Sequence, residues 1–317
     1  AIPGVEVLHV SRRWKAVTVE LIDDAAIFEL STMGGVREIA PVYKPQTNAG
    51  SVESRAPIAM KSDMARNLYG LDGSGQKVGV ISDSFNTTSG VRDADTFPPA
   101  GQPGILRNAK NQKSGDLPAQ VEILEDIPSG IDEGAGMAEL IYDIAPGAAM
   151  AFHTGFISQQ NFADGIQDLA NAGSTVIVDD IIWFAEPMFQ HGLTAQTARD
   201  VVRAGIPYYS SAGNNANVSF RMTYNDAVPG TDDMAFPPTG NDFHVWPNGR
   251  RFLPITVTPG TAVTVLLQWN QPFDSVSPGN GSQIDLEMYL APGEDPDAIT
   301  AGTKNADTRS AMAWMGA

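Results

Sequence analysis

The stretch that decides the fold is Gly130-Ile-Asp-Glu-Gly-Ala-Gly-Met-Ala-Glu-Leu-Ile-Tyr-Asp-Ile-Ala-Pro-Gly-Ala148. Its apolar residues recur at the spacing of one helical face, which predicts an amphipathic helix. These residues are Met137, Leu140, Ile141 and Ile144. Asp132 suits the N-cap position, and Pro146 ends the helix. Glu133 falls in the first turn on the inward face, either as a favourable first-turn carboxylate or as a functional group.

The composition fits a globular protein of one large or two modest domains. The chain has 317 residues, of which 42% are apolar and 18% charged. Acidic residues outnumber basic ones by 37 to 20, so the net charge is −17 and the pI is near 4.5. This balance disfavours nucleic acid and anionic membranes as partners, because both require a basic surface. It is typical of a secreted or cell-surface protein, of cation binding, or of an acidic or salty habitat.

Cysteine is absent, which excludes disulfides, thiolate metal sites and a cysteine nucleophile. No run of about 18 apolar residues occurs, so we expect no membrane-spanning segment. The first residues, Ala1-Ile-Pro-Gly4, do not form a signal peptide, and we expect the chain to begin inside a longer precursor.

The first 50 residues predict a small α/β piece and a linker. We expect strands at residues 16–21 and 36–43 and a helix at residues 24–33. Residues 45–54 are polar and rich in turn formers, which is typical of a linker or a processing site.

Residues 51–235 predict an α/β domain, because strand and helix patterns alternate there. We expect strands at residues 77–82, 121–124, 148–152, 175–178 and 207–212, and helices at residues 161–172 and 193–204. Such alternation is typical of a parallel sheet flanked by helices. Polar residues follow several of these strands, at the edge where ligand sites lie in such sheets.

Residues 236–305 predict an inserted antiparallel β-sandwich. Residues 251–257, 262–269 and 284–290 alternate at period two, with Pro, Gly and Asn between them. The tail at residues 306–317 is unassigned, although residues 307–317 are a weak helix candidate.

Three polar residues lie at the ends of predicted strands and helices in the α/β part of the chain. Asp83 follows a buried strand, Glu133 opens a helix, and Asn214 follows a strand in Ser210-Ser-Ala-Gly-Asn. Each also has an ordinary explanation, because a strand-end Asp often caps a turn and Ala-Gly-Asn often forms one.

Taken in order, the three features resemble the subtilase superfamily of serine peptidases. Residues 73–84 resemble its strand with the catalytic Asp, residues 133–148 its His-Gly-Thr helix and Ala-Pro-Gly-Ala turn, and residues 211–214 its oxyanion-hole segment. Residues 16–43 are similar to the last part of the inhibitory propeptide, and residues 176–183 occupy the place of the substrate-binding strand. The resemblance implies a subtilisin-like sheet, a polypeptide substrate and the chain's own propeptide as a partner.

The resemblance also implies the site residues. These are Asp83, Glu133 and Asn214 for catalysis and Asp180, Ile181 and Ile182 for substrate binding. Asp180 could equally bind a cation or cap a turn. Glu133 stands where most subtilases have the catalytic His, as does the Glu base of the sedolisin branch. Sedolisins carry an Asp where this chain has Met137 and another where it has Asn214, so the combination is a hybrid of two branches.

The hypothesis assigns Glu133 as general base, Asp83 as the group that orients it and Asn214 as the oxyanion donor. None of the four histidines, His9, His153, His191 and His244, is placed to replace Glu133. Two carboxylates in a partly dry site ionise in two steps, so an acid-shifted pH optimum is expected.

The family's nucleophile segment, Gly-Thr-Ser-Xaa-Ala-Xaa-Pro, has no match in this sequence. Ser310 precedes a helical run but lacks the flanking Gly and Pro, so it is a poor candidate. We expect the chain to stop before the serine arrives. Without that serine no acyl-enzyme forms.

The β-rich part has its own candidate site and resembles the jelly-roll modules often attached to subtilases. Asp274, Asp285 and Glu287 carry the oxygen ligands that Ca²⁺ prefers, or are solvent-facing strand residues. Trp246 and Trp269 belong either to the core or to a sugar-binding surface. The alternatives to a peptidase are therefore a pseudopeptidase or adhesive surface protein, and a Ca²⁺-dependent carbohydrate-binding module at residues 244–290.

Overall fold

The computed structural model describes residues 2–40, 42, 55–215, 218–225, 244–250, 253–256, 264–284, 286, 288–290, 301–303 and 312–316. The chain divides into two compact units. Unit 1 comprises residues 1–186 and 191–214, and unit 2 comprises residues 187–190 and 215–317. Within the described residues, every helix is too short or too polar to cross a membrane.

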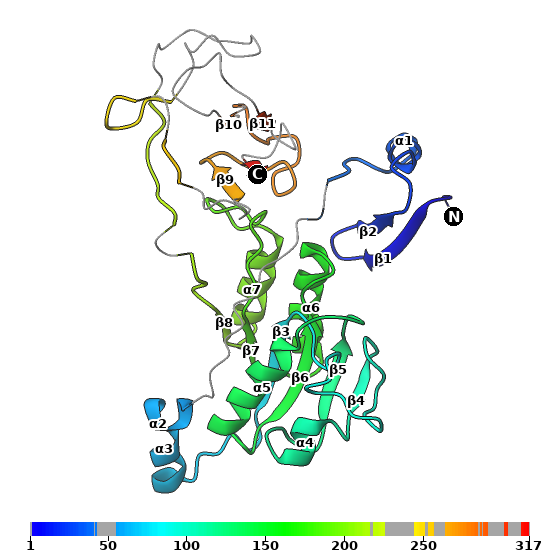
Figure 1. Ribbon diagram of the computed structural model, residues 1–317, viewed down its shortest axis with the longest axis vertical. Coiled ribbons are helices and arrows are strands. Elements are labelled where there is room, and N and C mark those ends of the chain that lie inside the picture. Colours follow the sequence, from blue (N-terminus) through cyan, green and yellow to red (C-terminus); the bar gives the residue numbers. More distant parts are fainter. Residues whose placement is uncertain are drawn as a thin grey trace. The chain divides into compact units, whose positions relative to one another are not determined.

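Unit 1 is built on a mostly parallel sheet (Figure 1). Among the described residues this sheet has six strands in the order β4-β5-β6-β3-β7-β8, and only β4 runs antiparallel to its neighbour. The strands are β3 (Lys77–Ser82), β4 (Gly104–Leu106), β5 (Val121–Glu125), β6 (Ala149–Thr154), β7 (Val176–Asp179) and β8 (Tyr208–Ser210). The predicted α/β class, with a mostly parallel sheet flanked by helices, is confirmed.

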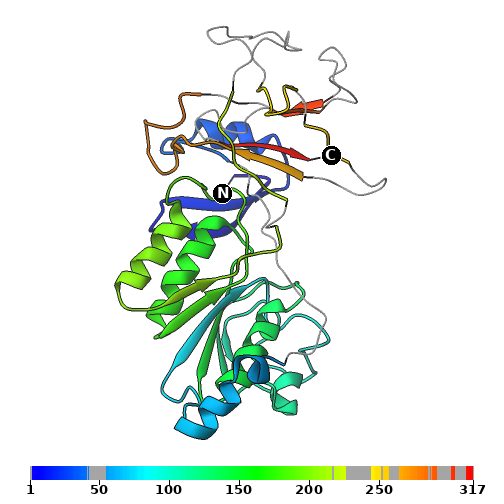
Figure 2. The same cartoon turned by 90° about the vertical axis from the view of Figure 1, so that its left-hand side faces the viewer.

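Helices cover both faces of this sheet (Figure 2). They are α5 (Glu133–Ile144) on one face and α6 (Gln159–Asn171) and α7 (Leu193–Arg203) on the other, besides the short α2 (Ala56–Met60), α3 (Ser62–Tyr69) and α4 (Lys110–Ser114). Successive strand residues point to opposite faces. Val80 and Phe152 therefore belong to the core under α5, whereas Ile81 and Ala151 belong to the core under α6.

The order of the strands makes the end of β3 a switch point. α5 connects β5 to β6 on one side of β3, and α6 then crosses over β3 to reach β7 on its other side. In open α/β sheets, ligands bind outside the carboxyl ends of the strands at such a reversal. The carboxyl ends of β3, β7 and β8 are called the carboxyl edge below.

The N-terminal piece of unit 1 is a hairpin and a helix. β1 (Val5–Ser11) pairs antiparallel with β2 (Ala16–Leu21), and α1 (Ala26–Thr32) follows. The predicted strand at residues 16–21 and helix at residues 24–33 are confirmed. The strand predicted at residues 36–43 is wrong for residues 36–40 and 42, and its other residues lie outside the described ones. A strand needs a ladder partner, and within the described residues β2 pairs with β1 alone.

Among its described residues, unit 2 contains two antiparallel strand pairs. β9 (Thr264–Gln268) pairs with β12 (Met312–Gly316), and β10 (Met288–Leu290) pairs with β11 (Ala301–Thr303). The predicted strand at residues 251–257 is wrong for residues 253–256, and its other residues are not described. The weak helix at residues 307–317 is also wrong where it is described, because residues 312–316 form β12. Pairing with a distant strand overrides the local helical pattern there.

Candidate functional site

The first turn of α5 lies against the end of β3. The helix begins at Glu133, as predicted. Its buried residues are the small side chains Gly134, Ala135 and Ala138, whereas Leu140, expected on the inward face, is 40% exposed. The position predicted for Leu140 is therefore wrong. Small side chains on the inward face let the helix approach the sheet closely.

Gly134 makes this close approach possible. A Cβ atom at this position would lie 2.4 Å from a ring carbon of Phe152 and 2.8 Å from the carbonyl oxygen of Ser84. The N–H of Gly134 donates to the same Ser84 oxygen at 3.1 Å. A glycine directly after Glu133 therefore brings the first turn of α5 onto the end of β3.

Asp83 holds the N-terminus of α5 from the end of β3. Its side chain is 3% exposed, and its two oxygens accept hydrogen bonds from the backbone N–H groups of Ile131 (2.7 Å) and Glu133 (2.9 Å). Asp83 thus acts on Glu133 through the backbone. The same bonds also suffice to explain Asp83 as a structural cap, because helix N-termini carry N–H groups without intrahelical partners.

Asp132 occupies the predicted N-cap position, but its carboxylate does not cap α5. It accepts instead from the backbone N–H groups of Thr87 and Thr88, at 2.9 and 2.6 Å, and from the hydroxyl of Ser84 at 2.9 Å. Asp83 therefore binds amides on either side of Asp132, and Asp132 binds amides in the loop after Asp83. We call this exchange the reciprocal clamp.

Asp126, which follows β5, adds a third carboxylate that the sequence reasoning missed. It is buried and accepts from the backbone N–H groups of Phe85 (3.2 Å), Asn86 (3.3 Å) and Ile127 (2.9 Å). Burial raises the pKa of Asp126 to about 7. The three hydrogen bonds lower this pKa, and the neighbouring carboxylate of Asp132 raises it further. Asp126 and Asp132 together hold four consecutive amides, at residues 85–88.

Ser82 touches the proposed base directly. Its hydroxyl donates to Oε2 of Glu133 at 3.2 Å. A serine within hydrogen-bond distance of a carboxylate is the usual signature of an activated nucleophile. Ser82 is 0% exposed, however, so a substrate carbonyl cannot reach it, and its role is to orient Glu133. The available signal was a serine that ends the otherwise apolar run Val78-Gly-Val-Ile-Ser82.

Asn214 lies at the far end of the carboxyl edge and is exposed. It follows Gly213, which has a φ of +67° and packs so closely that a Cβ there would lie 2.7 Å from Cδ1 of Ile182. The loop carrying Asn214 therefore rests on the predicted substrate-binding segment. In that segment Asp180 and Ile182 are partly exposed, whereas the side chain of Ile181 is buried in the core under α6.

Asp179 joins these two segments at the ends of β7 and β8. Its carboxylate accepts from the hydroxyls of Tyr208 (2.6 Å) and Ser210 (3.1 Å) and from the N–H of Ile181 (3.2 Å). Burial raises the pKa of Asp179 and raises that of Tyr208 well above its usual value. The sequence indicated a polar strand end here but not these partners.

One edge of the sheet thus carries all three predicted catalytic residues. Asp83 and Glu133 lie at the end of β3, and Asn214 follows β8. Only β7 separates β3 from β8, and neighbouring strands are about 4.8 Å apart, so these two strand ends are about 10 Å apart. This spacing suits an extended ligand that touches both ends.

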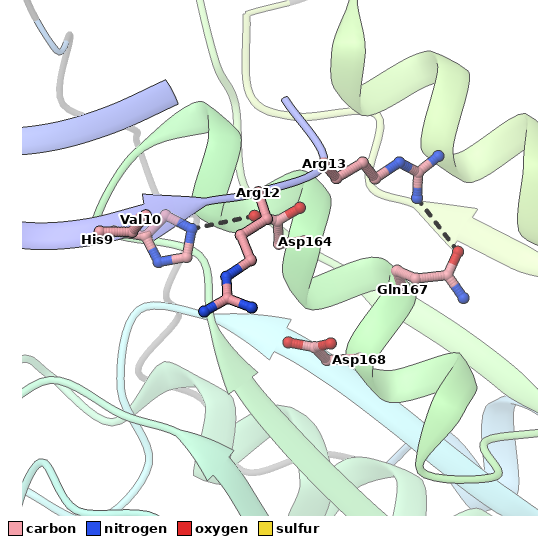
Figure 3. A pocket seen from close by; sticks show the side chains of 7 residues that line it. All are labelled: His9, Val10, Arg12, Arg13, Asp164, Gln167 and Asp168. Carbon is pink, nitrogen blue, oxygen red and sulfur yellow. Dashed lines mark hydrogen bonds and ion pairs between the residues drawn. The ribbon is translucent and has the colours of Figure 1, made fainter. Parts of the chain in front are cut away.

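His9 and His153 both contact α6, on the face of the sheet opposite to α5. A cleft of about 320 Å³ between β1 and α6 is lined by His9, Val10, Arg12, Arg13, Asp164, Gln167 and Asp168 (Figure 3). Within it Nε2 of His9 is 3.1 Å from Asp164 Oδ2, and Arg13 donates to Gln167 at 3.2 Å. His153 is buried beneath Gly165 of α6, 3.2 Å from Glu125. The contacts of His9 and Arg13 hold the N-terminal hairpin on α6.

The predicted Ca²⁺ site is described only in part. Asp274 accepts from the N–H of Gly279 at 2.7 Å beside a cavity of about 280 Å³. Asp285 and Glu287 lie outside the described residues, as does Ser310. In the part of the chain that the structure describes, no group of three His, Asp or Glu side chains is arranged to hold a metal ion.

No protein-family model matches this sequence, and no curated protein matches it.

Proposed function

We propose that unit 1 is the scaffold of a subtilase-like serine endopeptidase in which Glu133 replaces the catalytic histidine. One observation carries the proposal. Asp83 binds the backbone of Glu133 while Ser82 binds its carboxylate, at the switch point of a parallel sheet. Backbone and side chain of the same glutamate are therefore both fixed, which is what a general base requires.

The proposed roles follow from these contacts. Glu133 takes the proton from a serine hydroxyl, and Asp83 positions it through the N–H group of its own backbone. Asn214 donates its side-chain amide to the oxyanion that develops on the substrate carbonyl. Asp180 and Ile182 line the path of the polypeptide, because both are partly exposed and Ile182 contacts Gly213 in the loop that carries Asn214.

The remaining parts of the proposal concern other regions of the chain. The hairpin and helix at residues 1–50 are a propeptide remnant, and the β-rich residues 236–305 are a jelly-roll-like insertion that binds Ca²⁺ through Asp274, Asp285 and Glu287. The nucleophile is a serine other than Ser82, because Ser82 is buried. A secreted or cell-surface protein fits the acidic composition.

The test compares Glu133→Gln with Glu139→Gln, a matched change on the same helix. Glu139 is half-buried and accepts a hydrogen bond from Asn111, so it controls for loss of a carboxylate on α5. Casein hydrolysis is measured from pH 3 to 8 in a parent protein that includes the nucleophilic serine. We expect an acid optimum, a loss of roughly 10²–10⁴-fold in Glu133→Gln and little change in Glu139→Gln.

A fluorophosphonate probe, followed by mass spectrometry, identifies the serine that Glu133 activates. Labelling of one serine in the parent and not in Glu133→Gln supports the assignment. Equal hydrolysis by the parent and Glu133→Gln contradicts it.

A second candidate is a pseudopeptidase that keeps the scaffold for binding. The observation that favours it is the reciprocal clamp, since structural hydrogen bonds account for both oxygens of Asp83. A folded parent that neither hydrolyses casein nor takes the probe at any pH supports this candidate. A glycan screen with and without a chelator then tests binding by unit 2.

A further inference from the structure

One buried carboxylate joins the two segments that leave the sheet after β7 and β8. Asp179 is 3% exposed and ends β7, where it pairs with Ser210 of β8. Three groups donate hydrogen bonds to its carboxylate. They are the N–H of Ile181 in its own segment and the hydroxyls of Tyr208 and Ser210 in β8. The N–H of Ser211 also donates to the carbonyl oxygen of Asp179, at 3.2 Å.

These hydrogen bonds restrain both the segment at residues 180–182 and the loop that carries Asn214. Ile181, whose N–H binds Oδ1 of Asp179, precedes Ile182, and Ile182 contacts Gly213 so closely that a Cβ atom there would clash. Ser210 binds the same oxygen and begins the path to Asn214. A shift of either segment would therefore break a hydrogen bond to Asp179.

An Asp179 that served only to end β7 would need one or two local hydrogen bonds. Here Tyr208, two positions before Ser210, also donates to Oδ2 at 2.6 Å, so both oxygens are used and both strands contribute. A buried carboxylate is costly unless it is hydrogen-bonded, and donors to both of its oxygens restrain its orientation.

We propose that Asp179 is a positioning residue that fixes the spacing between residues 180–182 and the loop 211–214. The inference rests on the proposed function only in that these two segments bind a polypeptide and its oxyanion. A peptide lying along residues 180–182 presents its carbonyl to Asn214 only while this spacing is kept.

Asp179→Asn tests the inference, because it keeps the volume but replaces one acceptor oxygen by an NH₂ donor. Hydrogen exchange of the full chain is measured by mass spectrometry. We expect exchange on the order of tenfold faster in residues 180–182 and 211–214, with Val80 and Ile81 of β3 unchanged. Tyr208→Phe removes one of the three donors and gives a smaller change in the same segments. The control is Asp168→Asn on α6, whose carboxylate is 56% exposed.

A second readout separates positioning from stability. With a peptide substrate, Asp179→Asn raises KM about tenfold and leaves the pH dependence of kcat unaltered. Glu133→Gln, in contrast, abolishes the pH dependence of kcat. Unchanged exchange in both segments, or equal acceleration across the whole sheet, overturns the inference. Because exchange needs no catalysis, an inactive parent contradicts the peptidase proposal alone. An active parent with unaltered KM in Asp179→Asn contradicts this inference alone.

Discussion

The carboxyl edge is built differently at its β3 end and its β8 end. At β3, buried Asp83 and Asp132 exchange hydrogen bonds with each other's loops, and Ser82 binds Glu133. At β8, Asn214 is exposed and follows a glycine with a positive φ. The fold itself therefore orients the proposed base, whereas a surface loop carries the proposed oxyanion donor.

This difference matters because electrostatic catalysis depends on groups that are oriented before the substrate arrives. At the β3 end the hydrogen bonds that orient Glu133 also stabilise the fold, so stability and activity should be lost together. At the β8 end stability and activity should separate, because substitution of an exposed side chain usually changes stability little.

The largest expected effect is on stability at the β3 end. Asp132→Ala leaves the N–H groups of Thr87 and Thr88 and the hydroxyl of Ser84 without their acceptor, which costs about 3 kcal/mol of unfolding free energy. Asn214→Ala changes it by less than about 0.5 kcal/mol. Urea unfolding measures both variants. Similar losses of unfolding free energy in Asp132→Ala and Asn214→Ala would show that the β3 and β8 ends do not differ in this way.

The β3 end is also expected to respond to pH. The carboxyl group of Asp126 has an ordinary pKa of 3.8, and burial raises this pKa to about 7 in the folded state. Between these values the folded chain binds more protons than the unfolded one, so this group's stabilisation is complete below pH 3.8 and is lost as pH rises through 7. The loss from pH 5 to pH 7 is about 2 kcal/mol.

Asp126→Asn isolates this contribution, because asparagine has a similar shape and does not titrate. Unfolding free energies of the parent and the variant are compared at pH 5, 6 and 7. The difference between them should shrink or reverse as pH rises. A constant difference would show that Asp126 does not titrate in this range.

In unit 1 the sequence predicted β2, β3, β5 to β8, α1 and α5 to α7, because their patterns are local, and it missed β1, β4 and the short helices α2, α3 and α4. The run from Lys77 to Ser82 is apolar enough to mark a buried strand, and the residues after Asp132 repeat at helical spacing until Pro146. The strand-end rule then placed Asp83 at the edge of the sheet where ligand sites lie, and the strand order shows that this end of β3 is a switch point. β12 was missed because its strand character comes from β9, more than 40 residues earlier in the chain.

The partners of the buried carboxylates could not be predicted in the same way. Asp126 and Asp132 bind backbone amides about 40 positions earlier, and every non-proline residue carries such an amide. Which amides lack a partner depends on how the loop at residues 85–88 leaves β3. The link between Ser82 and Glu133 likewise exists only after α5 has packed on β3.

The smallest expected effect tests the close approach that creates this difference between the two ends. Gly134→Ala places a methyl group against the Phe152 ring and the Ser84 carbonyl, so overpacking outweighs the gain in helix propensity and the net loss is about 1 kcal/mol. Gly136→Ala, on the same helix with open space around it, gains up to about 1 kcal/mol instead. Thermal unfolding measures the pair. Since Gly134 adjoins Glu133, Gly134→Ala should also lower casein hydrolysis, while Gly136→Ala should leave it unchanged. Equal stability of the two variants would mean that α5 can withdraw from β3, and the fixed position of Glu133 would then have no basis in packing.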